Sequence, residues 1–467
     1  MMKFYLVILT LIVLATGAMA QTVAPNSLFT LAKTGTPAQI DAAIKAGADV
    51  NAKDVTTAKT PLMIAAESNK DVAVIAALLK AGANIDARST TAVDVDPDAP
   101  KQIIEENDDY NYYNYNRYNP RPPVILYDEC TALMYAADKN PNQEVTLALL
   151  AAGAKVNVRS RQSKSPLAYA AASKYTSIKV ISALLKAGAK IDNRDHTGYT
   201  PLISAAGNPN TTVEIITALL AAGAQINDRS RYGTTALLLA ARNNPNMAVF
   251  TKLLDAGAQL TDTDLGGTTP LLFSAEYNPS AEIVSYFIKG AADKINNKDK
   301  VGESAIIRAA NNNTNPEVIN VLLKAGANLE ELTPNDRMTP LLHAISSNKN
   351  SAVISALIAA GANMKVTDSN GYTPLMAAAF SSANPDVIAV LVKAGMQIEE
   401  RSKYGLTPLM IAAKDNPNPE IITALLAAGA NPKTKSYGGL IAFDYADRNM
   451  NIRGSNAYWV LNNARFN

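Results

Sequence analysis

The chain has 467 residues and a formal net charge of +2, from 43 lysines and arginines against 41 aspartates and glutamates. A strong basic excess is expected of a protein that binds DNA or RNA, so this balance argues against a nucleic-acid partner. Apolar residues make up 48% of the chain but aromatic residues only 6%. The core is therefore expected to consist of Ala, Leu, Ile and Val, whose small side chains allow helices to stack closely.

The first 20 residues read as a cleaved signal peptide. Lys3 supplies the positive charge, residues 4–15 are apolar, and small residues precede a cut that would leave Gln21 first. The apolar run is short for a bilayer, which needs about 20 residues, although an uncleaved anchor is the alternative. The only cysteine, Cys130, excludes an internal disulfide. Since exported eukaryotic proteins of this size usually carry several disulfides, we expect a bacterial protein, periplasmic or secreted, without a membrane segment after cleavage.

From residue 60 onward one short pattern recurs at a fixed spacing. Thr-Pro-Leu or Ser-Pro-Leu begins at Thr60, Ser165, Thr200, Thr269, Thr339, Thr373 and Thr407. Roughly 20 residues after each triplet come a pair of large aliphatic residues and, in most copies, Ala-Gly-Ala. From Leu133 to Leu409 the leucine position recurs every 34 or 35 residues, with Ile306 as the one replacement. A fixed period of this size indicates a solenoid, and here about eleven units.

Residues 195–228 illustrate what one unit contains. The polar stretch 195–199 includes a glycine and predicts a turn tip. Thr200 can cap a short first helix, and Pro201 suits the first helical position, where a missing N–H costs nothing. A second helix over about 212–222 has apolar residues at helical spacing and ends at Gly223. Each unit is therefore a turn followed by two antiparallel helices.

This pattern resembles the ankyrin repeat family, whose signature is T-P-L-H-x-A at a period of 33. The resemblance covers about residues 26–450 apart from one insertion, and it implies an all-α solenoid of helix-turn-helix repeats. The period here is one or two residues longer, and we place the extra residues in loops such as Asn244-Pro245-Asn246. A second departure is that the histidine position after the triplet is apolar, so packing must replace its hydrogen bonds; the residues there are Met63, Ile203, Leu272, Leu342, Met376 and Met410.

Five segments follow from this pattern. After the signal peptide come an N-terminal cap with the first repeats at 21–87, an insertion at 88–129, regular repeats at 130–434 and a C-terminal capping repeat at 435–467. End repeats of solenoids are atypical because they face solvent on one side. We expect Trp459, the only tryptophan, to close the apolar end of the stack.

The insertion at 88–129 breaks the period and has a biased composition. It is acidic and then rich in tyrosine and asparagine, with Tyr110, Tyr112, Tyr113, Tyr115 and Tyr118. One interpretation is a surface loop, and the other is a binding arm, because tyrosine gives large contact area at low entropic cost. Four acidic residues also match calcium-loop positions one, three, five and twelve, namely Asp94, Asp96, Asp98 and Glu105. That pattern requires glycine at position six, where Ala99 stands.

We find no catalytic motif. The zinc, nucleophile-elbow and phosphate-loop patterns are missing, the two histidines lie in different repeats, and Cys130 has no basic neighbour to lower its pKa. We therefore expect neither enzymatic activity nor a cofactor, and no metal beyond the incomplete calcium pattern. A carboxylate pair brought together by stacking stays possible from the sequence.

The resemblance implies that turn tips and the exposed face of the short helices contact a partner. Carried over repeat by repeat, the tip residues are Arg161, Gln162, Lys164, His196, Tyr199, Arg231, Tyr232, Lys300, Glu303, Asn370, Tyr372, Lys403 and Tyr404. Tyrosine and arginine are enriched at interface hot spots, although turn tips are solvated and polar in any case. The sequence favours an exported, monomeric scaffold that binds a protein through its tips and concave face. The alternative is a ligand- or calcium-responsive module, or a degenerate enzyme, acting through the 88–129 arm.

Overall fold

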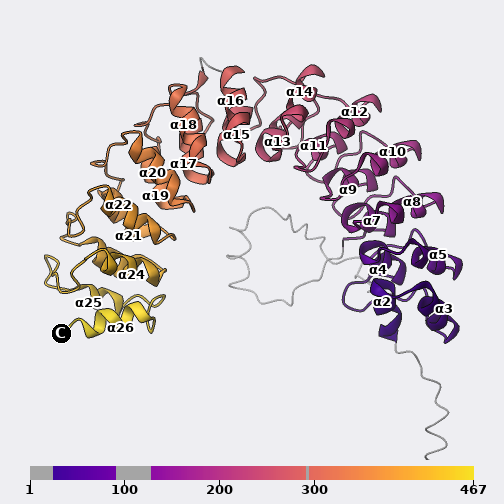
Figure 1. The fold of residues 1–467 in the computed structure, drawn as a ribbon, viewed down its shortest axis with the longest axis horizontal. Coiled ribbons are helices and arrows are strands. Elements are labelled where there is room, and N and C mark those ends of the chain that lie inside the picture. Colours follow the sequence, from indigo (N-terminus) through magenta and orange to yellow (C-terminus); the bar gives the residue numbers. More distant parts are fainter. Residues whose placement is uncertain (1–24, 91–127, 291–293, 467) are drawn as a thin grey trace, which may run out of the picture. The chain divides into compact units, whose positions relative to one another are not determined.

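The computed structural model describes residues 25–90, 128–290 and 294–466, and within these ranges all regular secondary structure is helical. The 24 helices form twelve consecutive antiparallel pairs (Figure 1), against about eleven expected. The pair at each end of the chain lacks a Thr-Pro-Leu triplet and forms all the same. The all-α solenoid prediction is confirmed.

The contacts divide the chain into two units, residues 1–201 with 218–224, and residues 202–217 with 225–467. In the first unit the pairs are α2 (Pro25–Thr34) with α3 (Pro37–Lys45), α4 (Pro61–Ser68) with α5 (Val72–Lys80), α7 (Ala132–Lys139) with α8 (Gln143–Ala151), and α9 (Pro166–Ala172) with α10 (Ile178–Lys186). The pair α11 (Pro201–Ala206) and α12 (Val213–Ala221) lies at the division.

The second unit contains the remaining seven pairs. They are α13 (Ala236–Asn243) with α14 (Met247–Asp255), α15 (Pro270–Tyr277) with α16 (Ala281–Gly290), α17 (Ala305–Asn312) with α18 (Pro316–Lys324), α19 (Pro340–Ser347) with α20 (Ser351–Ala359), α21 (Pro374–Ser381) with α22 (Asp386–Lys393), α23 (Pro408–Asp415) with α24 (Pro419–Ala427), and α25 (Ala442–Ala446) with α26 (Asn456–Asn463).

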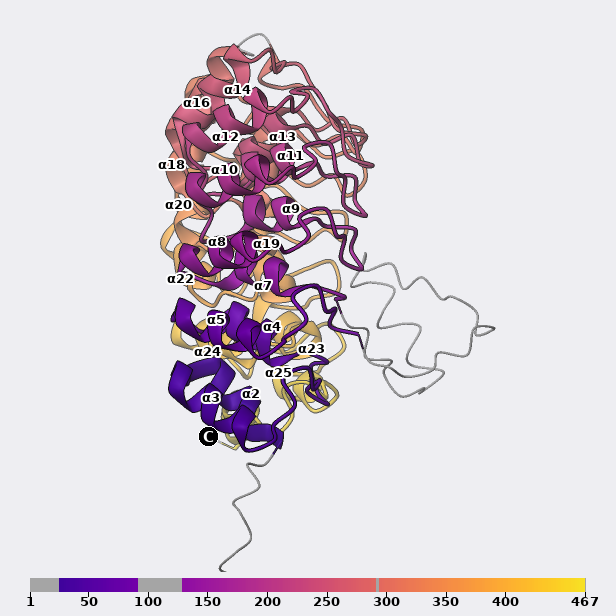
Figure 2. The same ribbon diagram turned by 90° about the vertical axis from the view of Figure 1, so that its right-hand side faces the viewer.

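Within each unit the helices form two rows. First helices contact the first helices of neighbouring pairs, as α13 does α15 and α15 does α17, and second helices do the same, as α16 does α18. Figure 2 shows the turns between pairs projecting from the side of the first-helix row. Each unit therefore offers a row of turns beside a row of short helices.

The helix ends follow the residues that predicted them. In α15, Thr269 Oγ1 accepts a hydrogen bond from Leu272 N at 3.2 Å, and Pro270 occupies the first turn. The second helix α14 ends at Asp255, and Gly257, two residues later, has a φ of 100°, a left-handed conformation that glycine adopts without strain. The same arrangement in successive repeats fixes the helix lengths.

A ladder of buried asparagines joins successive pairs. Asn348 Nδ2 donates to the carbonyls of Ala310 and Asn313 in the preceding repeat, at 2.9 and 2.8 Å, and its Oδ1 accepts from Asn350 N at 2.9 Å. It is the first residue of the loop between α19 and α20 and caps the end of α19. The same bonds to the preceding repeat are made by Asn69, Asn140, Asn244, Asn278, Asn313, Asn416 and Asn449. The first asparagine of the loop between the two helices thus holds one repeat to the next.

At the C-terminal pair the expectation for Trp459 differs from the structure. Trp459 is 52% exposed, whereas Tyr458 and Leu461 on the same helix are buried. Tyr458 packs against Phe443 with ring centroids 5.2 Å apart. Positions three residues apart share one face of a helix, so with Tyr458 and Leu461 turned inward Trp459 faces solvent.

Several predictions fall on residues outside the described ranges. These are the signal peptide at 1–20, the arm residues Tyr110, Tyr112, Tyr113, Tyr115 and Tyr118, and the calcium candidates Asp94, Asp96, Asp98 and Glu105. Among the helices that the structure does describe, none combines the length and hydrophobicity needed to cross a bilayer.

Candidate binding surface at the turn tips

Each turn tip is closed by the side chain of its first residue. Asp299 Oδ1 accepts hydrogen bonds from Val301 N at 2.9 Å and from Glu303 N at 3.0 Å. In tips that begin with serine the hydroxyl oxygen is the acceptor, and Ser402 Oγ accepts a hydrogen bond from Tyr404 N at 3.3 Å. Asp195, Asp264 and Asp368 accept backbone hydrogen bonds in the same way. One carboxylate oxygen of each of these aspartates is therefore engaged within its own turn.

Neighbouring tips are joined by backbone hydrogen bonds. In the first unit His196 N donates to Gln162 O at 2.9 Å. In the second unit Leu265 N donates to Tyr232 O and Lys300 N to Gly266 O, each at 2.9 Å. These bonds join the tips at 160–164 and 195–199 in the first unit, and those at 230–234, 264–268 and 299–303 in the second unit, into an edge.

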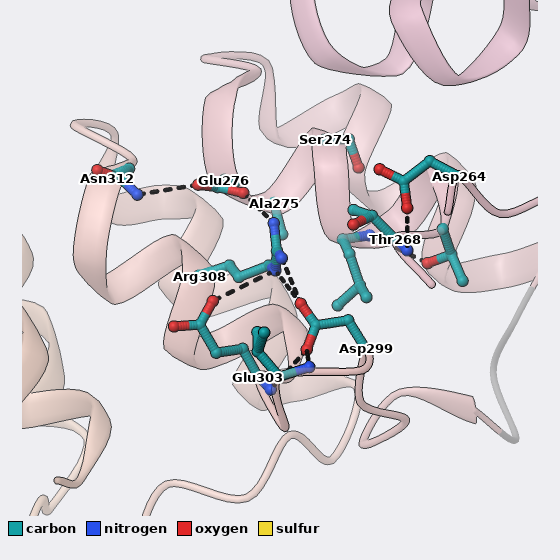
Figure 3. Close-up of polar contacts among 12 residues, drawn as sticks. Asp264, Thr268, Ser274, Ala275, Glu276, Asp299, Glu303, Arg308 and Asn312 are labelled. Carbon is teal, nitrogen blue, oxygen red and sulfur yellow. Dashed lines mark hydrogen bonds and ion pairs between the residues drawn. The ribbon is translucent and has the colours of Figure 1, made fainter. Parts of the chain in front are cut away.

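A charged network lies behind this edge, on the first helices of the second unit (Figure 3). The Arg308 guanidinium on α17 pairs with Glu276 of the preceding repeat and with Asp299, and its Nε lies 3.5 Å from Glu303. Asn312 Nδ2 also donates to Glu276 at 3.0 Å. Burial raises the pKa of Glu303, and the carboxylates of Asp299 and Glu276 raise it further while Arg308 opposes them.

Two protein-family models match the chain. The model for ankyrin repeats in three copies matches residues 96–195, 167–264, 237–333, 271–368 and 341–436, and the single ankyrin repeat model matches residues 59–90. The chain belongs to the ankyrin repeat family. A comparison with curated proteins gives no match. Ankyrin repeats generally mediate protein–protein interaction, and proteins built from them are typically scaffolds without enzymatic activity.

The ankyrin tip residues named from the sequence differ in exposure. Arg161, His196, Arg231, Tyr232, Lys300, Asn370, Lys403 and Tyr404 are exposed, whereas Gln162, Lys164, Tyr199, Glu303 and Tyr372 are half-buried. Glu303 faces Arg308, so its carboxylate belongs to the charged network. The charged tip side chains that a partner can reach are mostly cationic.

Sequence reasoning missed four exposed apolar side chains at the tips. Val55 is 88% exposed, Leu265 64%, Val301 58% and Tyr437 73%. Each lies one or two residues after the aspartate or serine that closes its tip. Aligning the repeats on that closing residue would have found all four.

The insertion begins and ends within this edge. Ser89 N donates to Cys130 O at 3.1 Å, and Cys130 N donates to Ser89 Oγ at 2.9 Å. Arg88 pairs with Glu129 at 3.1 Å across the two ends, and Arg161 N of the next tip donates to Asp128 O. The two described ends of the insertion, at residues 88–90 and 128–130, therefore lie where a turn tip would begin and end in the first unit.

The cysteine and the histidine that could take part in catalysis, Cys130 and His343, are both buried. Burial raises the pKa of the Cys130 thiol to about 11, so the thiol stays protonated at neutral pH. His343 Nε2 lies 3.3 Å from Thr333 Oγ1 and 4.0 Å from Asp336 Oδ1; burial lowers its pKa, and Asp336 only partly offsets this. Among residues 25–90, 128–290 and 294–466 no group of His, Cys, Asp and Glu is arranged to hold a metal ion.

Proposed function

We propose that this chain is an exported ankyrin scaffold that binds a protein partner through its turn tips. The observation that carries the proposal is the division of side chains at the tips. Aspartates such as Asp299 are used to close the turns, while Arg231, Tyr232 and Lys403 are exposed. Arginine and tyrosine contribute strongly to protein interfaces because they combine large contact area with hydrogen bonding.

Export is proposed from the first 20 residues and the single cysteine. In the periplasm or outside the cell the scaffold would act by occupancy, as a stabiliser or organiser of its partner. Expression of the whole chain in a bacterial host, followed by fractionation and N-terminal sequencing, tests this. A mature chain that begins at Gln21 outside the cytoplasm supports export; an uncleaved chain in the cytoplasm contradicts it.

A second candidate function rests on the arm, because its two ends are fixed at Ser89 and Cys130 within the edge of tips. In this version the arm residues, or a calcium ion held by Asp94, Asp96, Asp98 and Glu105, control binding. Calcium titration by calorimetry, with the melting temperature as a second readout, tests whether the ion binds. If no heat is released and the melting temperature does not shift, calcium does not control binding.

Deleting residues 91–127 separates the two functions. The partner, captured by cross-linking in the native compartment and identified by mass spectrometry, is then tested for binding to the deletion variant. If the tips are the binding surface, binding survives the deletion. If the arm is the binding element, binding is lost while the melting temperature is unchanged.

A further inference from the structure

The two adjacent tips near the C-terminus carry the most exposed tyrosines of the described edge. Tyr404, in the tip at 402–406, is 62% exposed, and Tyr437, in the tip at 436–440, is 73% exposed. Both belong to the second unit. We call these tyrosines, with Lys403 and Lys435, the C-terminal tip patch.

The Tyr437 ring is exposed and yet held in place. A Cβ added at Gly405 would lie 2.5 Å from Tyr437 Cγ, so the ring rests against the Gly405 backbone. Arg401 donates to the carbonyls of Gly405 at 3.0 Å and Lys435 at 2.8 Å, which ties the two tips together. The Arg401 guanidinium also lies 5.9 Å from the centre of the Tyr437 ring. The open face of this ring is therefore preorganised for contact, which reduces the entropic cost of binding.

The charged side chains that a ligand meets at this patch are cationic. Lys403 and Lys435 are both exposed, and Lys403 Nζ lies 5.1 Å from the centre of the Tyr404 ring. The Glu399 carboxylate is committed to the protein, since it accepts from Asn431 N at 2.7 Å and from Thr434 Oγ1 at 2.8 Å. Two exposed tyrosines thus alternate along the chain with two exposed lysines.

We propose that the C-terminal tip patch binds an extended segment of a partner protein in which carboxylate side chains alternate with apolar ones. This inference rests on the proposed function and adds the chemistry of the partner. Phosphate sites converge several donors on one point. Here the Arg401 guanidinium is committed to two carbonyls, and the two lysines stand on separate tips. The net charge of +2 over the whole chain also disfavours nucleic acid.

A selection from a random 12-residue peptide library on the full chain tests the proposal. The enriched peptides should be acidic and carry apolar residues. Replacing their Asp and Glu with Asn and Gln should weaken binding at least about tenfold, measured by fluorescence anisotropy. Raising the salt concentration should weaken the binding of the acidic peptides and leave the binding of the amide versions nearly unchanged.

Two double variants locate the binding. Tyr404→Ala with Tyr437→Ala, and Lys403→Glu with Lys435→Glu, should each reduce affinity at least about tenfold. The matched control is Lys324→Glu with Lys349→Glu, two exposed lysines away from the tips, and its affinity should be unchanged. Equal melting temperatures for all variants show that folding is intact.

Neutral or basic peptides, no enrichment, or equal binding by the patch variants would overturn the proposal. The proposal would also be overturned if a 20-nucleotide single-stranded DNA or phosphatidylglycerol vesicles bound the chain in place of the peptides and failed to bind the lysine double variant. If the whole partner still cross-links to other tips in the patch variants, the scaffold function stands and only this inference fails. If no tip cross-links, both fail.

Discussion

Asn348 provides a quantitative test of how the repeats are held together. Its buried side chain makes three hydrogen bonds, two to the preceding repeat and one within its own loop. Each is worth about 1 kcal/mol net, so Asn348→Ala should lower the free energy of unfolding by about 3 kcal/mol. Asn348→Asp keeps the bond from Asn350 N but turns a carboxylate toward two carbonyl oxygens, so we expect a larger loss.

The assay is urea denaturation followed by far-ultraviolet circular dichroism, with the m-value checked because repeat proteins can unfold in parts. The exposed tip residue Asn335 supplies the control, and Asn335→Ala should change stability by less than about 0.5 kcal/mol. A loss below about 1 kcal/mol for Asn348→Ala would refute the view that the ladder holds adjacent repeats together.

Three further perturbations test buried groups. Arg308→Gln leaves three carboxylates without their guanidinium and should lower the free energy of unfolding by about 3–5 kcal/mol at pH 7. Because the pKa of Glu303 is already raised, its protonation favours the folded state, so the loss of stability measured by urea denaturation should shrink as the pH falls toward 4. A deficit that does not change with pH would contradict this. Burial lowers the pKa of His343, so the unfolded chain binds this proton at a higher pH than the folded chain, and stability falls as the pH drops below 6.5. His343→Phe should therefore reduce the fall of the melting temperature between pH 7 and 5. A fall as large as that of the unchanged chain would count against this reasoning. With its pKa raised to about 11, the Cys130 thiol should react with Ellman's reagent at pH 8 far more slowly in the native chain than in urea, and equal rates would mean that it is not buried.

The sequence predicts the repeat because its signals are local. Thr269 and Pro270 begin a helix, and Gly257 follows the end of one, through conformations and hydrogen bonds that involve only residues close in sequence. The interactions between repeats were not predictable in the same way. The bonds of Asn348 reach residues 35 and 38 positions earlier, and Arg308 meets Glu276 at a separation of 32, so both require the stacking register.

The exposed residues of the tips were predicted only in part, because exposure also depends on how the tip folds. Tyr232 and Tyr404 were found because tyrosine is recognisable as an interface residue, whereas Leu265 and Val301 are exposed only because the tip places them outward. Glu303 was named as a tip contact, but its orientation toward Arg308 depends on a helix that follows it. Trp459 was expected to close the apolar end of the stack, while its position beside Tyr458 on α26 leaves it 52% exposed.

Site-specific photo-cross-linking tests the central claim most directly, namely that the turn tips are the partner-binding edge. A photoreactive phenylalanine analogue replaces Leu265 or Tyr404 at the tips, or Thr251 or Asp255 on the second helix α14 as matched exposed controls. After irradiation in the native compartment, the account predicts adducts with one protein species from the tip positions and none from α14. Adducts from α14 alone, or equal adducts from both sets, would contradict it.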